Sequence, residues 1–542
     1  MKKRFAVCSL AAALLMLSAC GQQTKTEPQS PPPVDNGGVH LNWDALTPYE
    51  APKNQYTRRY ADYTDHLIAA DDYGTLIPFP GKRIYTQWMG DTWLYGLVTA
   101  QGEVVVDPVY CDALILQQYD SELGRTVSMP YLLLQKLNYD PDTEKELWDV
   151  AVAALDGSWV REGYTRFYGS SGELLVLGTA DGHMEVVNSD GTVRWNKSYA
   201  ELELPDYITE YGEVLDISGG TVCYWDDYDS PDRTIYYLDI ATGTVTKRIG
   251  GAIAWSFSDG LAAAWQEIDG AMLYGYVDRT GEWVIEPQYT EADAFHNGMT
   301  IVKLQDQSQA LIDETGNILL HCASGELFSI QSSDGTTLYL QVEDIGMRSL
   351  GEFNSASQYR VIAAYDADLQ PQAVPAAGET ILRHYNAYWL DPGESSWQDG
   401  TLTVGSADGE VTLALPTTYT PYNTMQTESG TVLQLVNDTD ESYSSAFYNS
   451  KGKLCIEVGR YSWISEKADL ITGENFLLGH YPDSVGYDIF DSTGKLLLSL
   501  PDTEWYPQLC SGLVLVQDLY GTGLRTLSGD WVFRYLVLDT DM

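Results

Sequence analysis

The stretch WLYGLVTAQGEVVVDPVYCDA, residues 93–113, returns 179 residues later as MLYGYVDRTGEWVIEPQYTEA, residues 272–292. The two copies are identical at 10 of 21 positions, including every glycine and the proline. Each copy has an apolar stretch, a polar turn at Gly102 or Gly281, and a second apolar stretch. Apolar segments on both sides of a glycine turn are typical of an antiparallel β-hairpin. This repeated hairpin decides the fold class.

A weaker form of the same hairpin recurs along the chain. Glycine is favoured in such turns because one residue takes a positive φ, and a preceding Asp or Asn caps the turn with its side chain. A worn copy near Asp366-Ala367-Asp368 would raise the number of hairpins from ten to eleven. The turn glycines of the eight weaker copies are Gly157, Gly191, Gly243, Gly316, Gly409, Gly452, Gly494 and Gly529.

The spacing of the hairpins predicts the architecture. Gly409, Gly452 and Gly494 are 43 and 42 residues apart, and the long offset of 179 is close to four steps of that size. A second short element, seen at 258–261, 297–299 and 511–513, opens a further strand ahead of a hairpin. Units of about 40–45 residues with several short strands predict an all-β, β-propeller-like body. Because a closed propeller usually has roughly four to eight blades, one large irregular propeller and two tandem β-domains both fit.

The second strong copy resembles the WG repeat of bacterial proteins. The resemblance rests on Tyr274-Gly275, the turn Asp278-Arg279-Thr280-Gly281 and the strand end Pro287-Gln288-Tyr289. Tyr274, and Tyr95 in the first copy, stand where that family has tryptophan. The resemblance implies a β-rich repeat and no catalytic residues. We predict a structural role as repeat turn glycines for Gly96, Gly102, Gly275, Gly281, Gly316, Gly452, Gly494 and Gly529.

The amino terminus predicts export and lipidation. Three basic residues precede an apolar run, 10–17, and then Ser18, Ala19 and Cys20. A helix of that length spans about 12 Å, far less than the ~30 Å of a bilayer core, so residues 1–19 are predicted to be a secretory signal peptide. Residues 17–21 resemble the lipobox of bacterial lipoproteins, which implies a diacylglyceryl group, with chains such as palmitate, on Cys20. An ordinary cleaved leader with an incidental cysteine is the alternative.

Composition suggests boundaries for the remaining chain. Residues 20–40 hold the lipidated cysteine and a flexible linker rich in Pro, Gln and Gly, which cannot bury enough apolar surface to fold. We expect a lead-in segment that packs on the first repeat, a first repeat region, a divergent connecting repeat and a second repeat region. These are residues 41–80, 81–322, 323–377 and 378–542.

Charge and composition limit the partners. The chain has 31 basic and 77 acidic residues, a net charge of -46, which disfavours nucleic acid as a partner. It also has 15 Trp and 38 Tyr, most of which strands need for their core. The remaining aromatic residues could contact a protein or glycan ligand. We therefore expect attachment to the extracytoplasmic face of the cell membrane through the lipid, and an unknown protein or glycan partner.

The sequence offers little chemistry for catalysis. The seven histidines are scattered outside metal-binding motifs, and Gly169-Ser170-Ser171-Gly172 lacks the spacing of a nucleophile elbow. No cofactor is expected. A weak calcium candidate is the acidic cluster of Asp226, Asp227, Asp229 and Asp232, although a solvated acidic loop is favoured because the order of a calcium-binding loop is missing.

Two classes of function remain. We favour a non-catalytic binding or scaffolding module formed by the propeller-like repeat body of a membrane-anchored lipoprotein. The alternative is a substrate-binding or glycan-hydrolysing lipoprotein that uses an acidic channel, since abundant Asp and Glu could supply a catalytic pair. The observation that discriminates between these two classes is whether carboxylates and exposed aromatic side chains converge at one mouth of the channel or are spread evenly.

Overall fold

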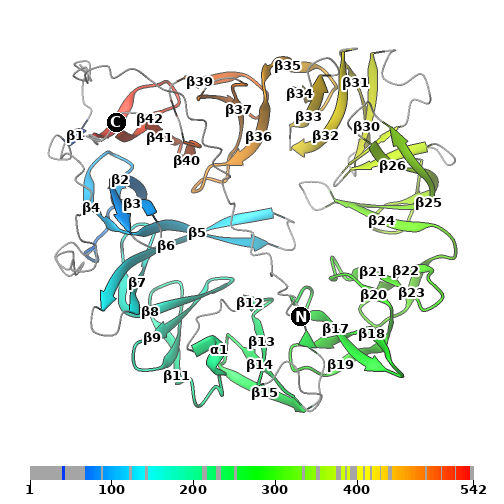
Figure 1. Ribbon diagram of the computed structural model, residues 1–542, viewed down its shortest axis with the longest axis horizontal. Helices are drawn as coiled ribbons and strands as arrows, with labels where there is room; N and C mark the ends of the chain where they lie inside the picture. The colour runs from blue at the N-terminus through cyan, green and yellow to red at the C-terminus, as the bar shows by residue number, and fades with distance from the viewer. Residues whose placement is uncertain are drawn as a thin grey trace. The chain divides into compact units, whose positions relative to one another are not determined.

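The computed structural model describes residues 40–42 and, with short gaps, residues 68–536. The predicted signal peptide, Cys20, the linker up to residue 39 and residues 43–67 of the lead-in segment lie outside this part of the chain. The described residues form strands β1 to β43 and one short helix, α1 (Asp206–Thr209). Residues 36–542 make one compact unit (Figure 1). Within the described part, no helix combines the length and apolar character needed to cross a membrane.

Hydrogen bonds group the strands into nine sheets, and two of these sheets each join two neighbouring units. In the first, residues 160–164 of β8 pair with β7, while residues 164–171 pair with β9. In the second, β26 pairs along its length with β25 but only through residues 358–360 with β28. The described strands therefore form eleven repeat units, one for each of the hairpins found in the sequence.

The first six units contain the following strands. Unit 1 has β2 (Leu76–Thr86), β3 (Gly90–Thr99) and β4 (Val104–Tyr110). Units 2 and 3 share β8 (Val160–Ser171) and have β5 (Asp112–Asp120), β6 (Arg125–Asp140), β7 (Lys145–Ala154), β9 (Leu174–Thr179), β10 (His183–Val187) and β11 (Val193–Ser198). Units 4 to 6 have β12 (Ile217–Ser218), β13 (Thr221–Trp225), β14 (Thr234–Asp239), β15 (Thr244–Ile249), β16 (Ile253–Ala254), β17 (Leu261–Ile268), β18 (Ala271–Asp278), β19 (Trp283–Tyr289), β20 (Glu291–Ala292), β21 (Met299–Lys303), β22 (Gln309–Asp313) and β23 (Ile318–Cys322).

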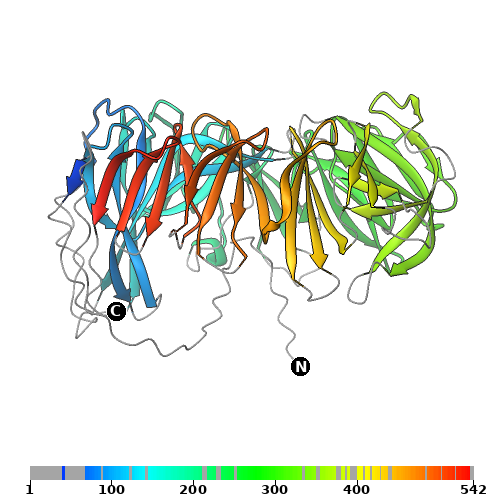
Figure 2. The same cartoon turned by 90° about the horizontal axis from the view of Figure 1, so that it is seen from above.

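The remaining strands complete the series. Units 7 and 8 have β24 (Glu326–Gln331), β25 (Thr337–Ser349), β26 (Ser355–Tyr365), β27 (Pro371–Gln372), β28 (Thr380–His384), β29 (Ala387–Leu390), β30 (Thr401–Ser406) and β31 (Gly409–Ala414). Units 9 to 11 have β32 (Tyr419–Thr427), β33 (Gly430–Asn437), β34 (Tyr443–Asn449), β35 (Leu454–Tyr461), β36 (Trp463–Ala468), β37 (Asn475–His480), β38 (Tyr487–Asp491), β39 (Leu496–Leu500), β40 (Gln508–Cys510), β41 (Leu513–Asp518), β42 (Gly521–Thr526) and β43 (Trp531–Leu536). β1 (His40–Asn42) joins the last sheet. In Figure 2, which is turned by 90° from Figure 1, the strands of the last units lie side by side in orange and red.

The predicted all-β, propeller-like repeat is confirmed at the level of strand register. Tyr276 pairs with Ile285 and Val277 with Trp283, so a β-bulge follows the hairpin turn. The first strong copy has the same register 179 residues earlier. The same pairing and bulge recur in β10–β11, β22–β23, β34–β35, β38–β39 and β42–β43. One hairpin geometry is therefore used in units whose sequences have few identities.

The turns of these hairpins share a side-chain cap. The Asp278 carboxylate accepts the backbone N–H groups of Thr280 (2.8 Å) and Glu282 (3.1 Å). Asp366 makes the same two contacts, at 3.0 and 2.8 Å, in the turn that the sequence marks as a worn copy. There Leu369 takes the positive φ of 60° that glycine has elsewhere. Such local capping explains why the turn survives sequence divergence.

Turn glycines also let several units approach the unit before them closely. A Cβ on Gly281 would lie 2.2 Å from the buried ring of Tyr237 in unit 4, and one on Gly494 would lie 2.8 Å from Cys455 in unit 9. In unit 1, a Cβ on Gly102 would lie 2.4 Å from the carbonyl oxygen of Val532 in β43. The contact between consecutive units therefore recurs between the last unit and the first.

Gly96 and Gly275 are not turn glycines, so the prediction for these two was wrong. They lie inside β3 and β18, where the register shifts. A Cβ would lie 2.6 Å from the carbonyl oxygen of Val106 at Gly96, and 2.3 Å from that of Ile285 at Gly275. The neighbouring strand crosses so closely at this bulge that no side chain fits.

Two further interactions join the ends of the repeat body. The ring of Phe79 in β2 packs edge-on against Phe533 in β43 at a centroid distance of 5.0 Å. β1 pairs in parallel with β43, with His40 opposite Phe533. A single apolar cluster combines side chains of β2 to β6 with those of β40 to β43. The first and last units are therefore packed neighbours, and the sheets form one body within residues 36–542.

The predicted limits between the repeat regions stay a prediction. One sheet contains strands from the connecting repeat, 323–377, and from the second region, 378–542. Within this sheet, three pairs between β26 and β28 are the hydrogen-bonded link across that limit.

We expect Gly281→Ala to destabilise the fold far more than Gly270→Ala, which lies in the same unit. Both glycines have a φ near +80°, but nothing lies within 4 Å of a Cβ at Gly270. The left-handed backbone alone costs about 1–2 kcal/mol, and the clash with Tyr237 should add about 2 kcal/mol or more. Urea unfolding of both variants measures the difference, and equal losses would contradict the close-approach role.

The capped turns predict acid sensitivity. Hydrogen bonds from Thr315 and Asn317 lower the pKa of Asp313 from 3.8 to about 2. Because this pKa is lower in the folded state than in the unfolded state, the ionised Asp313 carboxylate stabilises the fold above pH 3.8. This stabilisation is lost as the pH falls toward 2. Asp313→Asn keeps the cap, as Asn449 does in unit 9, but removes the titration. Between pH 4 and pH 2, the melting temperature of the variant should therefore fall less than that of the unchanged protein. The difference should correspond to less than about 1 kcal/mol of unfolding free energy, because solvent screens this exposed charge. Parallel pH profiles for the two proteins would refute this cause.

Candidate functional site

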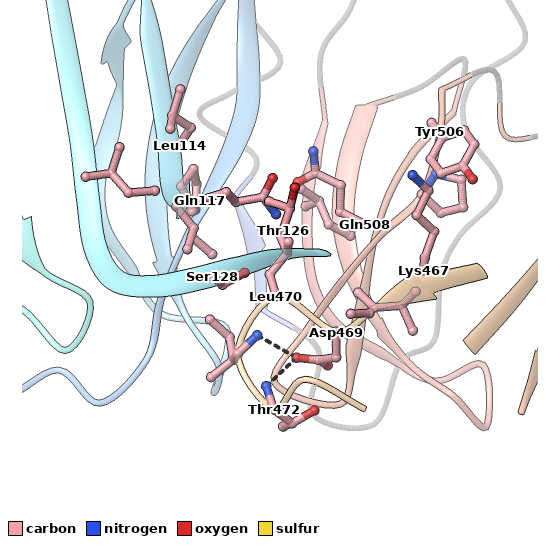
Figure 3. Close-up of a pocket in the computed structure, with 18 of the residues that line it drawn as sticks. Leu114, Gln117, Thr126, Ser128, Lys467, Asp469, Leu470, Thr472, Tyr506 and Gln508 are labelled. Atoms are coloured by element: carbon pink, nitrogen blue, oxygen red, sulfur yellow. Dashed lines mark hydrogen bonds between the residues drawn. The ribbon is translucent and has the colours of Figure 1, made fainter. Parts of the chain in front are cut away.

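A cavity of about 1180 Å³ lies where the first two units meet the last units (Figure 3). On one side it is lined by β2, β3, β5 and β6, and on the other by β36, the β36–β37 turn and β40 to β42. The same junction brings together residues more than 350 positions apart in the sequence, such as Asp112 and Asp469. The cavity therefore depends on the packing of the two ends of the repeat body.

Uncharged polar side chains occupy much of the cavity wall. Gln117 lies on β5, Thr126 and Ser128 lie on β6, and Gln508 opens β40. All four are exposed, and within the described residues no protein group is hydrogen-bonded to their side chains. Figure 3 shows Gln117 and Gln508 extending from opposite sides into the space between β5 and β40. Carboxamide and hydroxyl groups can both donate and accept hydrogen bonds, so this wall offers capacity of both kinds.

Asp469 fixes the floor of the cavity. Its side chain is 1% exposed and accepts the backbone N–H groups of Ile471 (2.8 Å) and Thr472 (2.9 Å) in its own turn. It also accepts those of Ser511 (2.9 Å) and Gly512 (2.7 Å) from unit 11. These four donors occupy the carboxylate oxygens and hold two units together. Asp469 therefore acts as a structural clamp between units.

Two aromatic side chains form the rim. Trp505 is 42% exposed and Tyr506 is 44% exposed. The ring of Tyr506 contacts Tyr487 at a centroid distance of 5.4 Å, and the Lys467 ammonium lies 5.1 Å from its centre. Its hydroxyl group is hydrogen-bonded to Ser465. Tyr506 is therefore held in place while much of its surface stays open to solvent.

Exposed aromatic side chains gather in one part of the described chain. All the large aromatic residues among the exposed hydrophobic side chains lie between residues 422 and 506. They belong to units 9 and 10 and to the connection that leads into unit 11. They are Tyr422, Tyr443, Trp463, Trp505 and Tyr506. The exposed aromatic side chains are therefore concentrated in one part of the repeat series and are not spread evenly along it.

The electrostatics of the cavity are mildly acidic. Asp112 is half-buried, and this burial raises the pKa of its carboxyl group. Burial, with a contribution from Asp112, also raises the pKa of Tyr95 on the facing strand. Asp469 is already saturated with N–H donors, and Lys467 is the basic residue of the lining. An anionic ligand would meet more carboxylates than ammonium groups here.

Several predicted residues lie elsewhere. The repeat glycines are distributed along the chain with the units, so they do not form a site. Asp227, Asp229 and Asp232 of the calcium candidate lie outside the described residues, and exposed Asp226 accepts the N–H of Thr234 at 2.8 Å. Among the residues that the structure describes, no group of three or more His, Cys, Asp or Glu side chains is placed to hold a metal ion.

Sequence reasoning missed the cavity residues. One usable signal existed, because Asp259 accepts the N–H of Gly298 at 2.9 Å, as Asp469 does with Gly512. Gly298 and Gly512 belong to the short element noted at 297–299 and 511–513. An acidic residue about one repeat ahead of that element is therefore a sequence signal for a carboxylate that binds the next unit.

Comparison with known proteins supports the repeat assignment. A model of the family described as WG containing repeat matches residues 274–307, which run from β18 to the turn after β21. No curated protein matches the chain significantly. The chain is similar to a solved eukaryotic initiation factor at 10% identity, with a TM-score of 0.33, over 79% of this chain and 98% of that one.

Two enzyme structures are also similar at this low level. For the dihydro-heme d1 dehydrogenase NirN in complex with DHE the identity is 10%, the TM-score is 0.25, and the coverage is 61% of this chain and 73% of that one. For the tricorn protease the identity is 11% and the TM-score is 0.22. That match covers 74% of this chain and 44% of the protease chain. The family match alone supports a WG-type repeat, at residues 274–307.

Asp469→Ala should cost at least about 3 kcal/mol, because four N–H donors lose their acceptor and buried donors without partners cost about 1–3 kcal/mol each. Asp259→Ala is the matched control, since that exposed carboxylate accepts a single N–H from the next unit. Urea unfolding compares the two variants, and amide exchange at Ser511 and Gly512 reports on the clamp. Unchanged exchange at these amides would exclude a clamp role.

Proposed function

We propose that the protein is a non-catalytic binding or scaffolding module, held on the extracytoplasmic face of a membrane by a lipid on Cys20. The WG-type repeat and the all-β repeat body support the binding or scaffolding part of this proposal. The observation that carries it is a cavity lined by two exposed aromatic side chains, Trp505 and Tyr506, together with polar side chains. Rigid aromatic side chains with one open face are a common basis of molecular recognition.

The membrane part of the proposal rests on the amino terminus. The leader and lipobox-like residues 17–21 precede a spacer that ends at β1. Each buried methylene of an acyl chain contributes about 0.8 kcal/mol, so a diacylglyceryl group would hold the protein on its membrane. The net charge of -46 repels anionic headgroups, which suits a body held away from the bilayer.

The state of Asp469 supports a non-catalytic role. Glycoside hydrolysis uses two carboxyl groups about 5–9 Å apart, one acidic and one basic or nucleophilic. Asp469 is engaged by four backbone donors and buried. Asp112, whose pKa is raised, is the observation that favours the hydrolytic alternative. The proposal therefore has to be tested for turnover as well as for binding.

Cys20→Ala should abolish lipid anchoring. The full-length protein, expressed in a bacterium that processes lipoproteins, should partition into the detergent phase of a Triton X-114 extract. The Cys20→Ala variant should lose this partitioning and its label from radioactive palmitate. Cys8→Ala, which changes the other cysteine of the leader, should keep both. A labelled Cys20→Ala protein would overturn the anchoring proposal.

Binding should be detectable with full-length protein solubilised in mild detergent. Immobilised protein should retain envelope components that a Trp505→Ala, Tyr506→Ala double variant loses, as identified by mass spectrometry of proteins and glycans. The matched control is Met347→Ala, which removes the side chain of an exposed residue on β25 that is remote in sequence from the cavity residues. Retention that is the same in both variants would place the binding surface elsewhere. Turnover of glycan substrates that Asp112→Asn abolishes would replace this proposal with the hydrolytic alternative.

A further inference from the structure

We infer that the ligand of the cavity is an uncharged glycan strand, whose sugar rings stack on Trp505 and Tyr506 while its hydroxyl groups bind the polar wall. This inference rests on the proposed binding function and names the class of ligand. It is argued from the polar wall, the aromatic rim, the charge of the lining and the size of the cavity.

The polar wall matches sugar hydroxyl groups. Gln117, Thr126, Ser128 and Gln508 present carboxamide and hydroxyl groups that the protein leaves without hydrogen-bond partners within the described residues. A carboxamide donates from its NH₂ group and accepts at its oxygen, and a sugar hydroxyl can serve both. Placing such groups on facing strands, β5 and β40, allows one ligand to be held from both sides (Figure 3).

The rim provides apolar faces beside this polar wall. The C–H face of a pyranose ring is apolar, and it packs well on an open aromatic ring. Tyr506 is fixed by Tyr487, Lys467 and Ser465, so it offers contact area at a low cost in conformational entropy. Figure 3 shows Tyr506 and Lys467 together on the β40 side of the cavity.

Unit 10 carries a further exposed aromatic ring. Tyr487 contacts His480 at a centroid distance of 5.0 Å, and His480 is paired across the sheet with Trp463, which is 46% exposed. Tyr506 and Trp463 are thus two exposed aromatic rings separated by the buried ring of Tyr487. Two separate exposed rings suit a chain of similar units better than a single compact molecule.

Charge selects against polyanions. The lining contains three acidic residues, Asp112, Glu466 and Asp469, and Lys467 is its basic residue. The whole chain has a net charge of -46. Bringing a polyanionic glycan or a nucleic acid to this cavity would be opposed at short and long range. An uncharged strand does not meet this opposition.

Size favours an oligomeric ligand. The cavity of about 1180 Å³ exceeds the roughly 300–1,000 Å³ of typical small-molecule pockets. A single sugar would therefore leave much of the wall uncovered. A stretch of several sugars could reach both Gln117 on β5 and the rim at Trp505.

The test is isothermal titration calorimetry with full-length protein in mild detergent. The probes are chitohexaose, cellohexaose and mannohexaose as uncharged glycans, with hexagalacturonate as the anionic counterpart. We expect one or more uncharged hexamers to bind and to shift the tryptophan fluorescence. The corresponding monosaccharides and the galacturonate should bind at least tenfold more weakly.

Variants connect the binding to the cavity. Trp505→Ala and Tyr506→Ala should each weaken the affinity about tenfold, and Gln508→Leu about fivefold. Tyr443→Ala is the matched control, because it removes an exposed aromatic ring that does not line the cavity. Gln508→Leu conserves bulk at an exposed position, so its melting temperature should match that of the unchanged protein and a loss of affinity would report recognition rather than unfolding.

Two results would overturn the inference. In the first, no uncharged hexamer binds, while the envelope pull-down still yields a protein partner that depends on Trp505. The binding function would then stand, and the proposed ligand class would be wrong. The other is glycan binding that Trp505→Ala and Gln508→Leu leave unchanged. If the pull-down and the titrations both fail, the proposed function itself fails.

Discussion

The structure depends on the close approach of many hairpin turns to the unit before them. A three- or four-stranded sheet has two faces, and a single unit cannot cover both of its own. Glycine in the turn removes the Cβ that would otherwise keep neighbouring units apart, as at Gly281 against Tyr237. The same contact between Gly102 and Val532 joins the last unit to the first. Stability is therefore a property of the series, because every unit completes the core of its neighbour.

The candidate site is a product of this arrangement. Its walls come from β5 and β6 near the beginning of the chain and from β36 and β40 near its end. Asp469 binds the turn of the next unit through its carboxylate, so the clamp that holds the units also shapes the cavity floor. Binding and structural integrity share residues at this junction. For this reason the informative substitutions are exposed ones, such as Trp505 and Gln508, which the core does not need.

Local features could be predicted from the sequence, and long-range ones could not. The hairpins were predictable because a turn glycine and its capping residue lie within a few positions of each other, even at the worn copy capped by Asp366. Identity between two copies marked Gly96 and Gly275, but it could not show that a crossing carbonyl group, rather than a turn, requires glycine there. Gln117 and Gln508 line the same cavity only after all the units have packed, so no local sequence pattern predicts the cavity.

The parallel pairing of β1 with β43 has a consequence for biosynthesis. His40 is made early, and its partner Phe533 leaves the ribosome almost 500 residues later. At about 5–20 residues per second, the first strand waits roughly 25–100 s for its partner. During this interval the apolar side chains of β2 that later contact β43 have no cover from it. The packing of the first unit can therefore be completed only after β43 has been made, so the folding of the two ends of the repeat body is coupled.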